Sequence, residues 1–166
     1  MHNEARCYVE SALARVGGAA GRTVLEIGSV YINGGVRDLC ADAALYVGLD
    51  PGDGPGVDIV CGAEDYDGGH AYDLVLCTEV LEHTPDPRAV IACAARALKP
   101  GGTLILTCAS TGRPPHGARG ATLPAQYEHY ANVPIEDIAV YLEGWEVIDL
   151  DYIAVPGDAR VIARWM

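Results

Sequence analysis

The stretch TVLEIGSVYINGGVRDLCADAALYVGLD, residues 23–50, decides the fold that this sequence predicts. It opens with the apolar run Thr23 to Ile27, which stops at Gly28. This pattern is typical of a buried parallel strand that runs into a tight turn. A glycine-containing loop at 33–35 leads toward a short helix, and a second apolar run then ends on Asp50. We therefore expect two neighbouring strands of a parallel sheet, with a turn and a helix between them.

The order strand, glycine turn, helix, strand and acid predicts a binding site for a cofactor that carries a nucleoside. Gly28 lets a ligand approach the backbone closely, and a carboxylate at the end of the second strand can accept hydrogen bonds from both ribose hydroxyls. The candidate carboxylate is Asp50.

Length and composition limit the function classes. A chain of 166 residues predicts one domain, residues 1–166, with enough apolar chain for a core. No apolar run is long enough to span a membrane, and the polar N-terminus carries no signal-peptide core, so cytoplasmic residence is the expectation. The net charge of −12 repels the phosphate backbone of a nucleic acid, so we expect no nucleic-acid partner. We interpret the charge as a contribution to solubility.

The six cysteines are interpreted as small hydrophobic residues. They form no C-x-x-C pair, and their wide spacing suits neither a zinc site nor a disulfide scaffold. Cys61, Cys77 and Cys108 fall in or at the ends of apolar strands, where a reduced cysteine packs like a hydrophobe. We expect no metal site.

The chain alternates strands and helices, which favours a doubly wound α/β sheet over a sandwich. The expected strands are 23–27, 45–49, 57–61, 72–77, 103–109, 145–153 and 158–165, and the expected helices are 3–16, part of 34–44, 86–98 and 134–142. We expect the first helix to pack on the sheet edge or to cover the site. The third and fourth strands should be joined mostly by loop, and residues 100–102 should form a sharp turn. Pro156 and Gly157 predict a short turn, so the last two strands should pair as an antiparallel hairpin.

Between Ser110 and Asn132 the periodicity disappears and prolines and glycines interrupt the chain. Such a long loop in a small domain is either a lid or binding loop, or a solvated surface loop. Its polar and aromatic side chains favour the acceptor side of a site; they are His116, Arg119, Gln126, Tyr127, His129 and Tyr130.

Five segments, in order and at suitable intervals, resemble the motifs of the class I S-adenosylmethionine-dependent methyltransferases, here of a small, single-domain type. They are Val24–Gly28, Gly48–Asp50, Cys61–Asp65, Tyr72–His83 and Leu98–Leu104. The resemblance runs from about Thr23 to Ala109, with a weaker match to the end of the chain. It implies a Rossmann-like, seven-stranded, mostly parallel sheet with an antiparallel C-terminal hairpin and helices on both faces. It also implies S-adenosylmethionine as cofactor and a small-molecule methyl acceptor.

The resemblance further implies a role for individual residues. Glu26 would bind the cofactor's amino group, Asp50 the ribose, and the residues at 62–64 the adenine, while the end of the fourth strand would form the floor under the sulfonium. The implied cofactor contacts are Glu26, Gly28, Ser29, Asn33, Asp50, Pro51, Gly62, Ala63, Glu64, Cys77, Thr78 and Glu79.

Two positions depart from the family's pattern. Val30 stands where a second glycine is usual, so the path past the methionine moiety can differ. Gly62 stands where an aspartate is usual, which removes a hydrogen bond to the adenine amine unless Glu64 or Asp65 substitutes.

The reaction implied is an in-line displacement at a methyl group, for which the protein mainly aligns acceptor, methyl and sulfur. A hydroxyl or amine acceptor can also need a base, and the candidates are His83, His116 and His129. Glu79 and Glu82 are interpreted as acids at the start of a helix rather than as bases.

Two alternatives stay open on the sequence. A nicotinamide-dependent dehydrogenase is disfavoured because Gly28 lacks the G-x-G-x-x-G continuation. A non-catalytic cofactor-binding or scaffold protein is consistent with Val30 and Gly62. The acceptor atom, whether oxygen, nitrogen, carbon or sulfur, is not indicated.

Overall fold

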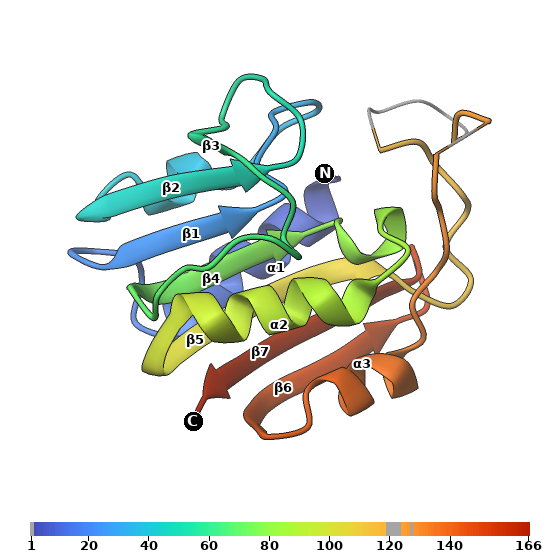
Figure 1. Cartoon of the computed structure of the whole chain (residues 1–166). Helices are drawn as coiled ribbons and strands as arrows, with labels where there is room; N and C mark the ends of the chain where they lie inside the picture. The colour runs from blue at the N-terminus through green and yellow to red at the C-terminus, as the bar shows by residue number, and fades with distance from the viewer. Residues whose placement is uncertain (1, 119–123, 127) are drawn as a thin grey trace.

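A computed structural model describes residues 2–118, 124–126 and 128–166. Within these residues seven strands form one sheet in the order β3-β2-β1-β4-β5-β7-β6 (Figure 1). The strands are β1 (Thr23–Ile27), β2 (Leu45–Asp50), β3 (Ile59–Val60), β4 (Tyr72–Thr78), β5 (Leu98–Ala109), β6 (Trp145–Ile153) and β7 (Asp158–Trp165). The helices are α1 (Asn3–Arg15), α2 (Pro87–Ala97) and α3 (Ile135–Tyr141), with 3-10 turns η1 (Arg37–Cys40) and η2 (Leu81–His83).

The predicted topology is confirmed. Strands β3, β2, β1, β4 and β5 are parallel, and β7 runs antiparallel to both β5 and β6. The hairpin forms because the turn at 154–157 reverses the chain between β6 and β7, and the Gly157 carbonyl accepts from the Ser110 amide at the end of β5. The carboxyl ends of β1, β2 and β4 therefore meet at one edge of the sheet.

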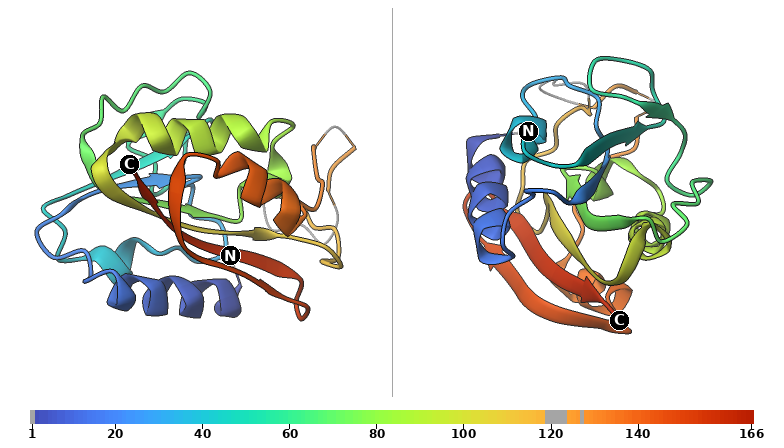
Figure 2. Two further views of the ribbon diagram at one scale, coloured as in Figure 1. Left: turned by 90° about the horizontal axis from the view of Figure 1, so that it is seen from below. Right: turned by 90° about the vertical axis from the view of Figure 1, so that its left-hand side faces the viewer.

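Helices cover both faces of the sheet, as predicted (Figure 2). On one face α2 and α3 pack over a large apolar core that includes Leu25, Val90 and Leu106. On the other face α1 and η1 cover a smaller core built from alternate residues of the same strands, including Val24 and Ile105. Each strand of the centre thus buries both of its faces, which explains its nearly continuous apolar sequence.

The first helix was expected to pack on the sheet edge or to cover the site, and it does neither. Val9, Ala12 and Leu13 of α1 pack on the face of the sheet, together with Leu74 and Ile162, and not on its edge. His2, the residue before α1, reaches the end of the sheet where the site lies. None of the described helices is both long and apolar enough to cross a bilayer.

Three local predictions need correction. The strand expected at 57–61 is reduced to Ile59–Val60. Before it, the amide and the carboxylate of Asp58 both bond to the backbone of Gly48. The preceding loop folds back toward the turn after β1, where the Pro55 carbonyl accepts from the Tyr31 amide. The helix expected in 34–44 is one 3-10 turn, Arg37–Cys40. Strand β5 begins at Leu98, so residues 100–102, expected to form a sharp turn, lie within the strand. They form an irregularity between the pair Leu98–Tyr72 and the pair Thr103–Leu74.

Candidate active site

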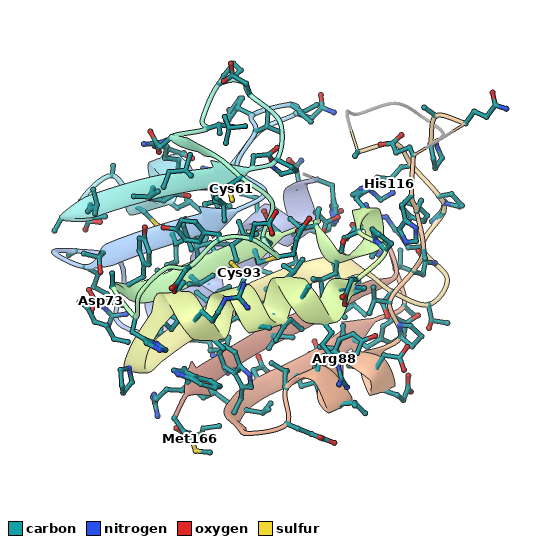
Figure 3. The ribbon with its side chains drawn as sticks, in the orientation of Figure 1. Cys61, Asp73, Arg88, Cys93, His116 and Met166 are labelled. Carbon is teal, nitrogen blue, oxygen red and sulfur yellow. The ribbon has the colours of Figure 1, made fainter. Side chains whose placement is uncertain are left out.

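A cavity of about 700 Å³ opens at the carboxyl ends of β1, β2 and β4. In an open α/β sheet this edge is where ligands bind, and the volume falls within the range of small-molecule sites. Figure 3 shows the side chains around it, with His116 on the loop beyond the strand ends. The walls come from the turn after β1, the loop after β2, the turn after β3, the segment after β4 and the loop after β5.

Eleven of the twelve predicted cofactor residues line this cavity. They are Glu26, Gly28, Ser29, Asn33, Asp50, Pro51, Gly62, Ala63, Glu64, Thr78 and Glu79. The twelfth, Cys77, does not line it. Its side chain belongs to the apolar core between the sheet and α2, because it points to the opposite side of β4 from its neighbours in the strand.

The turn after β1 is held in the shape that a close ligand approach requires. Gly28 has a φ of 79°, and a Cβ placed on it would lie 2.2 Å from Cγ2 of Val80. Only glycine fits such a position. Val30, the first departure from the family's pattern, has its side chain against Gly54, where an added Cβ would lie 2.7 Å from Cγ2 of Val30. Gly54 in the facing loop therefore accommodates the larger residue.

Asp50 joins the two loops that flank the cavity. Its Oδ2 accepts from the Val30 amide at 3.2 Å, and its Oδ1 accepts from the Gly52 amide at 2.8 Å. The carboxylate is thus fixed at the end of β2 while each oxygen keeps acceptor capacity for a further donor. The nearby hydroxyl of Ser29 is buried and has no hydrogen-bond partner among the described residues, so a ligand in this cavity can supply one.

Glu26, which could have been a surface acid, is buried with 5% of its surface exposed. Its Oε2 accepts a hydrogen bond of 2.8 Å from the Tyr46 hydroxyl. Burial raises the pKa of Glu26 to about 7, while the Tyr46 hydrogen bond and the charge of Arg37 act in the opposite direction. The acid of the first motif therefore titrates near neutrality.

The turn after β3 presents a second carboxylate beside Gly62. A Cβ built on Gly62 would lie 2.8 Å from the carboxyl group of Glu64. Arg96 of α2 fixes this turn by donating to the carbonyls of Ala63, at 3.0 Å, and Tyr66. The Glu64 carboxylate therefore lies where a side chain of residue 62 would begin.

Glu79 lies in a charge cluster that the sequence did not indicate. It has a left-handed backbone, with a φ of 56°, which is unusual for a residue other than glycine and typical of functional sites. Its carboxylate accepts from Thr107 at 3.0 Å and lies 3.3 Å from the His2 ring. Arg113 pairs with the fully buried Asp158, and His2 lies 3.2 Å from the same carboxyl group.

In this cluster the basic groups of His2 and Arg113 face the carboxylates of Glu79 and Asp158. Burial alone raises the pKa of Glu79, but the hydrogen bond and charge of His2 and the charge of Arg113 outweigh it and hold that pKa below its usual value. Burial alone lowers the pKa of His2, but its hydrogen bonds to Asp158, Glu79 and Glu4 outweigh it and raise the pKa to about 10. The two carboxylates therefore favour the protonated form of the His2 ring.

The His2→Ala variant is expected to be less stable than the wild type by about 1–2 kcal/mol near pH 6, the scale of hydrogen bonds to charged groups reduced by solvent screening of the partly exposed ring. Because folding raises the pKa of His2, its contribution is fully present below the unfolded value of about 6.5 and is lost as the pH rises toward 10. Denaturant unfolding of both proteins at pH 6, 8 and 10 measures this difference. A difference that does not shrink toward pH 10 would contradict the assignment.

Another buried acid lies in η2, the 3-10 turn after β4. Glu82 is fully buried, and neither of its carboxylate oxygens has a hydrogen-bond partner among the described residues. Burial, with the charge of Glu79 adding to it, raises the pKa of Glu82 to about 8. Glu79 and Glu82, interpreted as acids at the start of a helix, stand at a single 3-10 turn that follows Val80, where Glu82 is fully buried and Glu79 is partly buried.

Three rings lie beside Glu82. The His83 and His116 rings meet edge to face with centroids 5.1 Å apart, and Tyr130 contacts both, at 5.4 and 4.9 Å. His116 places Nε2 3.9 Å from Glu82 Oε1. Burial, with the neighbouring His116, lowers the pKa of His83, so that ring is neutral at pH 7.

The two histidines line the cavity together, whereas the third candidate base does not. His83 and His116 are both part of the wall. The side chain of His129 is exposed and lies outside it. Of the other residues expected on the acceptor side, Gln126 is exposed and outside the cavity wall, and Arg119 and Tyr127 lie outside the described residues.

Two groups of side chains within the described ranges place potential metal-ligand atoms within 4.8 Å of one another. They are Glu82, His83 and His116, and His2, Glu79 and Asp158. In the second group the Arg113 guanidinium already pairs with Asp158, so a metal ion would have to displace a cation. In the first group the Glu82 oxygens accept no hydrogen bond from the described residues, so the nitrogen and oxygen atoms of this group can accept a metal ion.

His2 and Arg113 are among the cavity residues that sequence reasoning missed. His2 precedes the first helix, and Arg113 stands in a loop without periodicity. Neither position carries a local pattern that distinguishes it from solvated surface.

The fold and this cavity define a class of protein, and comparison with known proteins agrees with it. Residues 1–148 match the model of a family described as a methyltransferase domain. The chain belongs to this family, as a class I S-adenosylmethionine-dependent methyltransferase. The family match decides against the dehydrogenase alternative.

The curated relatives are longer proteins. A ubiquinone biosynthesis O-methyltransferase of Cronobacter sakazakii is 36% identical over 111 residues, which cover 56% of this chain and 44% of the relative. The chain thus spans about half the length of the curated relatives that it matches.

Solved structures show the same fold. The 1,6-didemethyltoxoflavin-N1-methyltransferase of Burkholderia thailandensis, with S-adenosylhomocysteine bound, has a TM-score of 0.72 at 17% identity, covering 99% of this chain and 80% of its own. The magnesium protoporphyrin IX methyltransferase of Synechocystis PCC 6803, with S-adenosylmethionine bound, has a TM-score of 0.69 at 18% identity, covering 98% and 79%.

Proposed function

We propose that this protein transfers the methyl group of S-adenosylmethionine to a hydroxyl group of a small molecule. The observation that carries the proposal is the cavity at the carboxyl edge of the sheet, with Glu26 and Asp50 at the ends of adjacent strands in its wall. Methylation of oxygen is favoured by the curated relatives, which are named O-methyltransferases. A small acceptor is favoured over a nucleic acid by the net charge of −12. We also propose that residues 1–166 form one domain, because both cores lie on one sheet.

The residues in the wall fit this cofactor. Glu26 offers a carboxylate to its amino group, Asp50 offers acceptor oxygens to the ribose hydroxyls, and the unpartnered Ser29 hydroxyl lies beside them. When bound, the cofactor supplies an electrophilic methyl group on its sulfonium. The chain's own part is to fix the two reactants in line and to hold the acceptor against the wall formed by His83 and His116.

The acceptor hydroxyl must lose its proton, and we assign this step to the pair His83 and His116. Both rings line the cavity, and His83 is neutral at pH 7 and so able to accept a proton. His116 Nδ1 lies 3.3 Å from the Pro114 carbonyl, which favours the tautomer with hydrogen on Nδ1 and the lone pair on Nε2. Val80, Pro85 and Val90 supply apolar wall for the body of the acceptor.

Replacement of Glu64 is expected to weaken cofactor binding. We propose that its carboxylate, which lies beside Gly62, accepts from the adenine amine in place of the missing acid at that position. Glu64→Ala should raise the Kd for S-adenosylhomocysteine by about tenfold, the scale of one exposed hydrogen bond to a charged group. Calorimetry measures this, with Asp65→Ala as the matched control, since Asp65 is exposed and outside the cavity wall. Equal losses in both variants would refute the assignment.

Ligand-dependent thermal stability tests the proposed function. S-adenosylmethionine and S-adenosylhomocysteine should raise the melting temperature, and NAD should not, because only a ligand that binds the folded state stabilises it. Methyl transfer to a panel of phenolic, catecholic and aliphatic hydroxyl compounds should follow. Stabilisation without turnover on hydroxyl, amine or thiol acceptors would favour the non-catalytic alternative. Stabilisation by NAD alone would contradict the proposal.

A further inference from the structure

We propose that Tyr46 is a positioning residue of the cofactor site: its hydroxyl orients the Glu26 carboxylate and keeps it ionised for the amino group of the cofactor. Tyr46 is outside the cavity wall, so it acts through Glu26 and does not touch the ligand. This inference rests on the proposed function, because it requires Glu26 to receive that amino group.

The geometry of the sheet brings the two side chains together. In the parallel register Val24 pairs with Tyr46 and Glu26 pairs with Gly48, so Tyr46 and Glu26 project from the same face of adjacent strands. The Tyr46 hydroxyl donates to Glu26 Oε2 at 2.8 Å. Burial and the charge of Glu26 raise the pKa of Tyr46, so the hydroxyl stays protonated and remains a donor.

Arg37, which is itself part of the cavity wall, contacts both the ring and the backbone of Tyr46. Its guanidinium carbon lies 4.9 Å from the centre of the Tyr46 ring, and its Nη2 donates to the Tyr46 carbonyl at 3.3 Å. Arg37 is in turn paired with Asp58 at 3.0 Å. A continuous set of contacts therefore leads from the protein surface through Tyr46 to the acid in the cavity wall.

Glu26 needs this donor because few other groups favour its charge. The groups that act on it are Tyr46, Arg37, Cys40, Asp50 and Cys77. Only Tyr46 and Arg37 favour the ionised carboxylate, whereas burial and the charge of Asp50 oppose it. Loss of the Tyr46 hydroxyl therefore shifts the balance toward the neutral acid, which cannot pair with an ammonium group.

The Tyr46→Phe variant tests the proposal with S-adenosylhomocysteine as the probe. An upward shift of the Glu26 titration by about one pH unit, from about 7, would lower the ionised fraction at pH 7 from about one half to about one tenth. Calorimetry should then show about fivefold weaker binding at pH 7 and little difference at pH 9. Carbon-13 NMR of the Glu26 carboxyl group in the ligand-free protein should show the same shift directly.

Three controls separate positioning from simple damage. Tyr72→Phe removes a tyrosine hydroxyl that bonds to Tyr66 at the amino end of β4, far from the carboxyl ends of the strands. This variant should leave binding unchanged. Methylthioadenosine, which lacks the amino group, should bind wild type and Tyr46→Phe equally. In Glu26→Gln, which should itself lose the pH dependence, Tyr46→Phe should add no further effect.

The outcomes distinguish this inference from the proposed function. Weaker binding of Tyr46→Phe by the same factor at every pH, or an equal loss for methylthioadenosine, would overturn the positioning role while leaving the cofactor site intact. A Glu26 titration that is the same in ligand-free Tyr46→Phe as in ligand-free wild type would also overturn the positioning role. A wild-type protein that binds neither compound would overturn the proposed function, and the positioning role with it.

Discussion

The Asp50→Ala variant is expected to bind S-adenosylhomocysteine about 1–3 kcal/mol more weakly than the wild type, or about 5- to 150-fold in Kd. Two effects add in the same direction. The ribose hydroxyls lose a charged acceptor, and the amides of Val30 and Gly52 lose the carboxylate that fixes both loops of the cavity wall. Titration calorimetry at constant pH measures the change.

Asp53→Ala is the matched control for Asp50. Asp53 stands in the same loop, but it is exposed and does not line the cavity. Its replacement should leave the affinity within about 0.5 kcal/mol of the wild type, the usual range for surface substitutions. Unfolding without ligand shows how much stability each variant loses by itself. Unchanged affinity in Asp50→Ala would mean that the ribose lies elsewhere.

Replacement of His83 or His116 by alanine is expected to lower kcat for a hydroxyl acceptor by about 100-fold or more, the scale of general-base catalysis. The two rings form one contact cluster with Tyr130, so the double variant should lose little more than either single variant. The affinity for S-adenosylhomocysteine should change little, because the proposed amino-group and ribose contacts, Glu26 and Asp50, stand on β1 and β2. Initial rates and calorimetry on the same preparations measure both quantities.

His129→Ala is the control for this pair, since His129 is exposed and outside the cavity wall. Its activity should match the wild type. A second arm uses a chelator, because Glu82, His83 and His116 also place ligand atoms within 4.8 Å of one another. Activity that is lost with chelator and restored by a divalent metal ion would assign the histidines to metal binding rather than to proton transfer.

The parts of the fold that the sequence predicted are those where neighbouring residues determine the structure. The run from Thr23 to Ile27 and its end at Gly28 specify a buried strand and a tight turn, and both are observed with these bounds. Asp50 could be placed in the site because the carboxyl ends of adjacent parallel strands meet at one edge. The turn at 154–157 likewise specified the hairpin that ends the sheet.

The parts that could not be predicted depend on contacts between distant residues. Glu79 and Glu82 have the local pattern of acids at the start of a helix. In the structure Glu82 is fully buried and Glu79 partly buried, and residues of the loop after β5 and of the segment before α1 contact them: Arg113, His116 and His2. Cys77 was expected in the cavity, but alternation along β4 turns its side chain into the core. Such contacts carry no signal in the adjacent sequence.

A crystal structure of the protein with S-adenosylhomocysteine tests the central claim most directly. The account predicts the ligand across the carboxyl edge of the sheet, with its amino group at Glu26 and its ribose hydroxyls at Asp50. A ligand bound elsewhere, or one in this cavity with neither carboxylate in contact with it, would contradict the account.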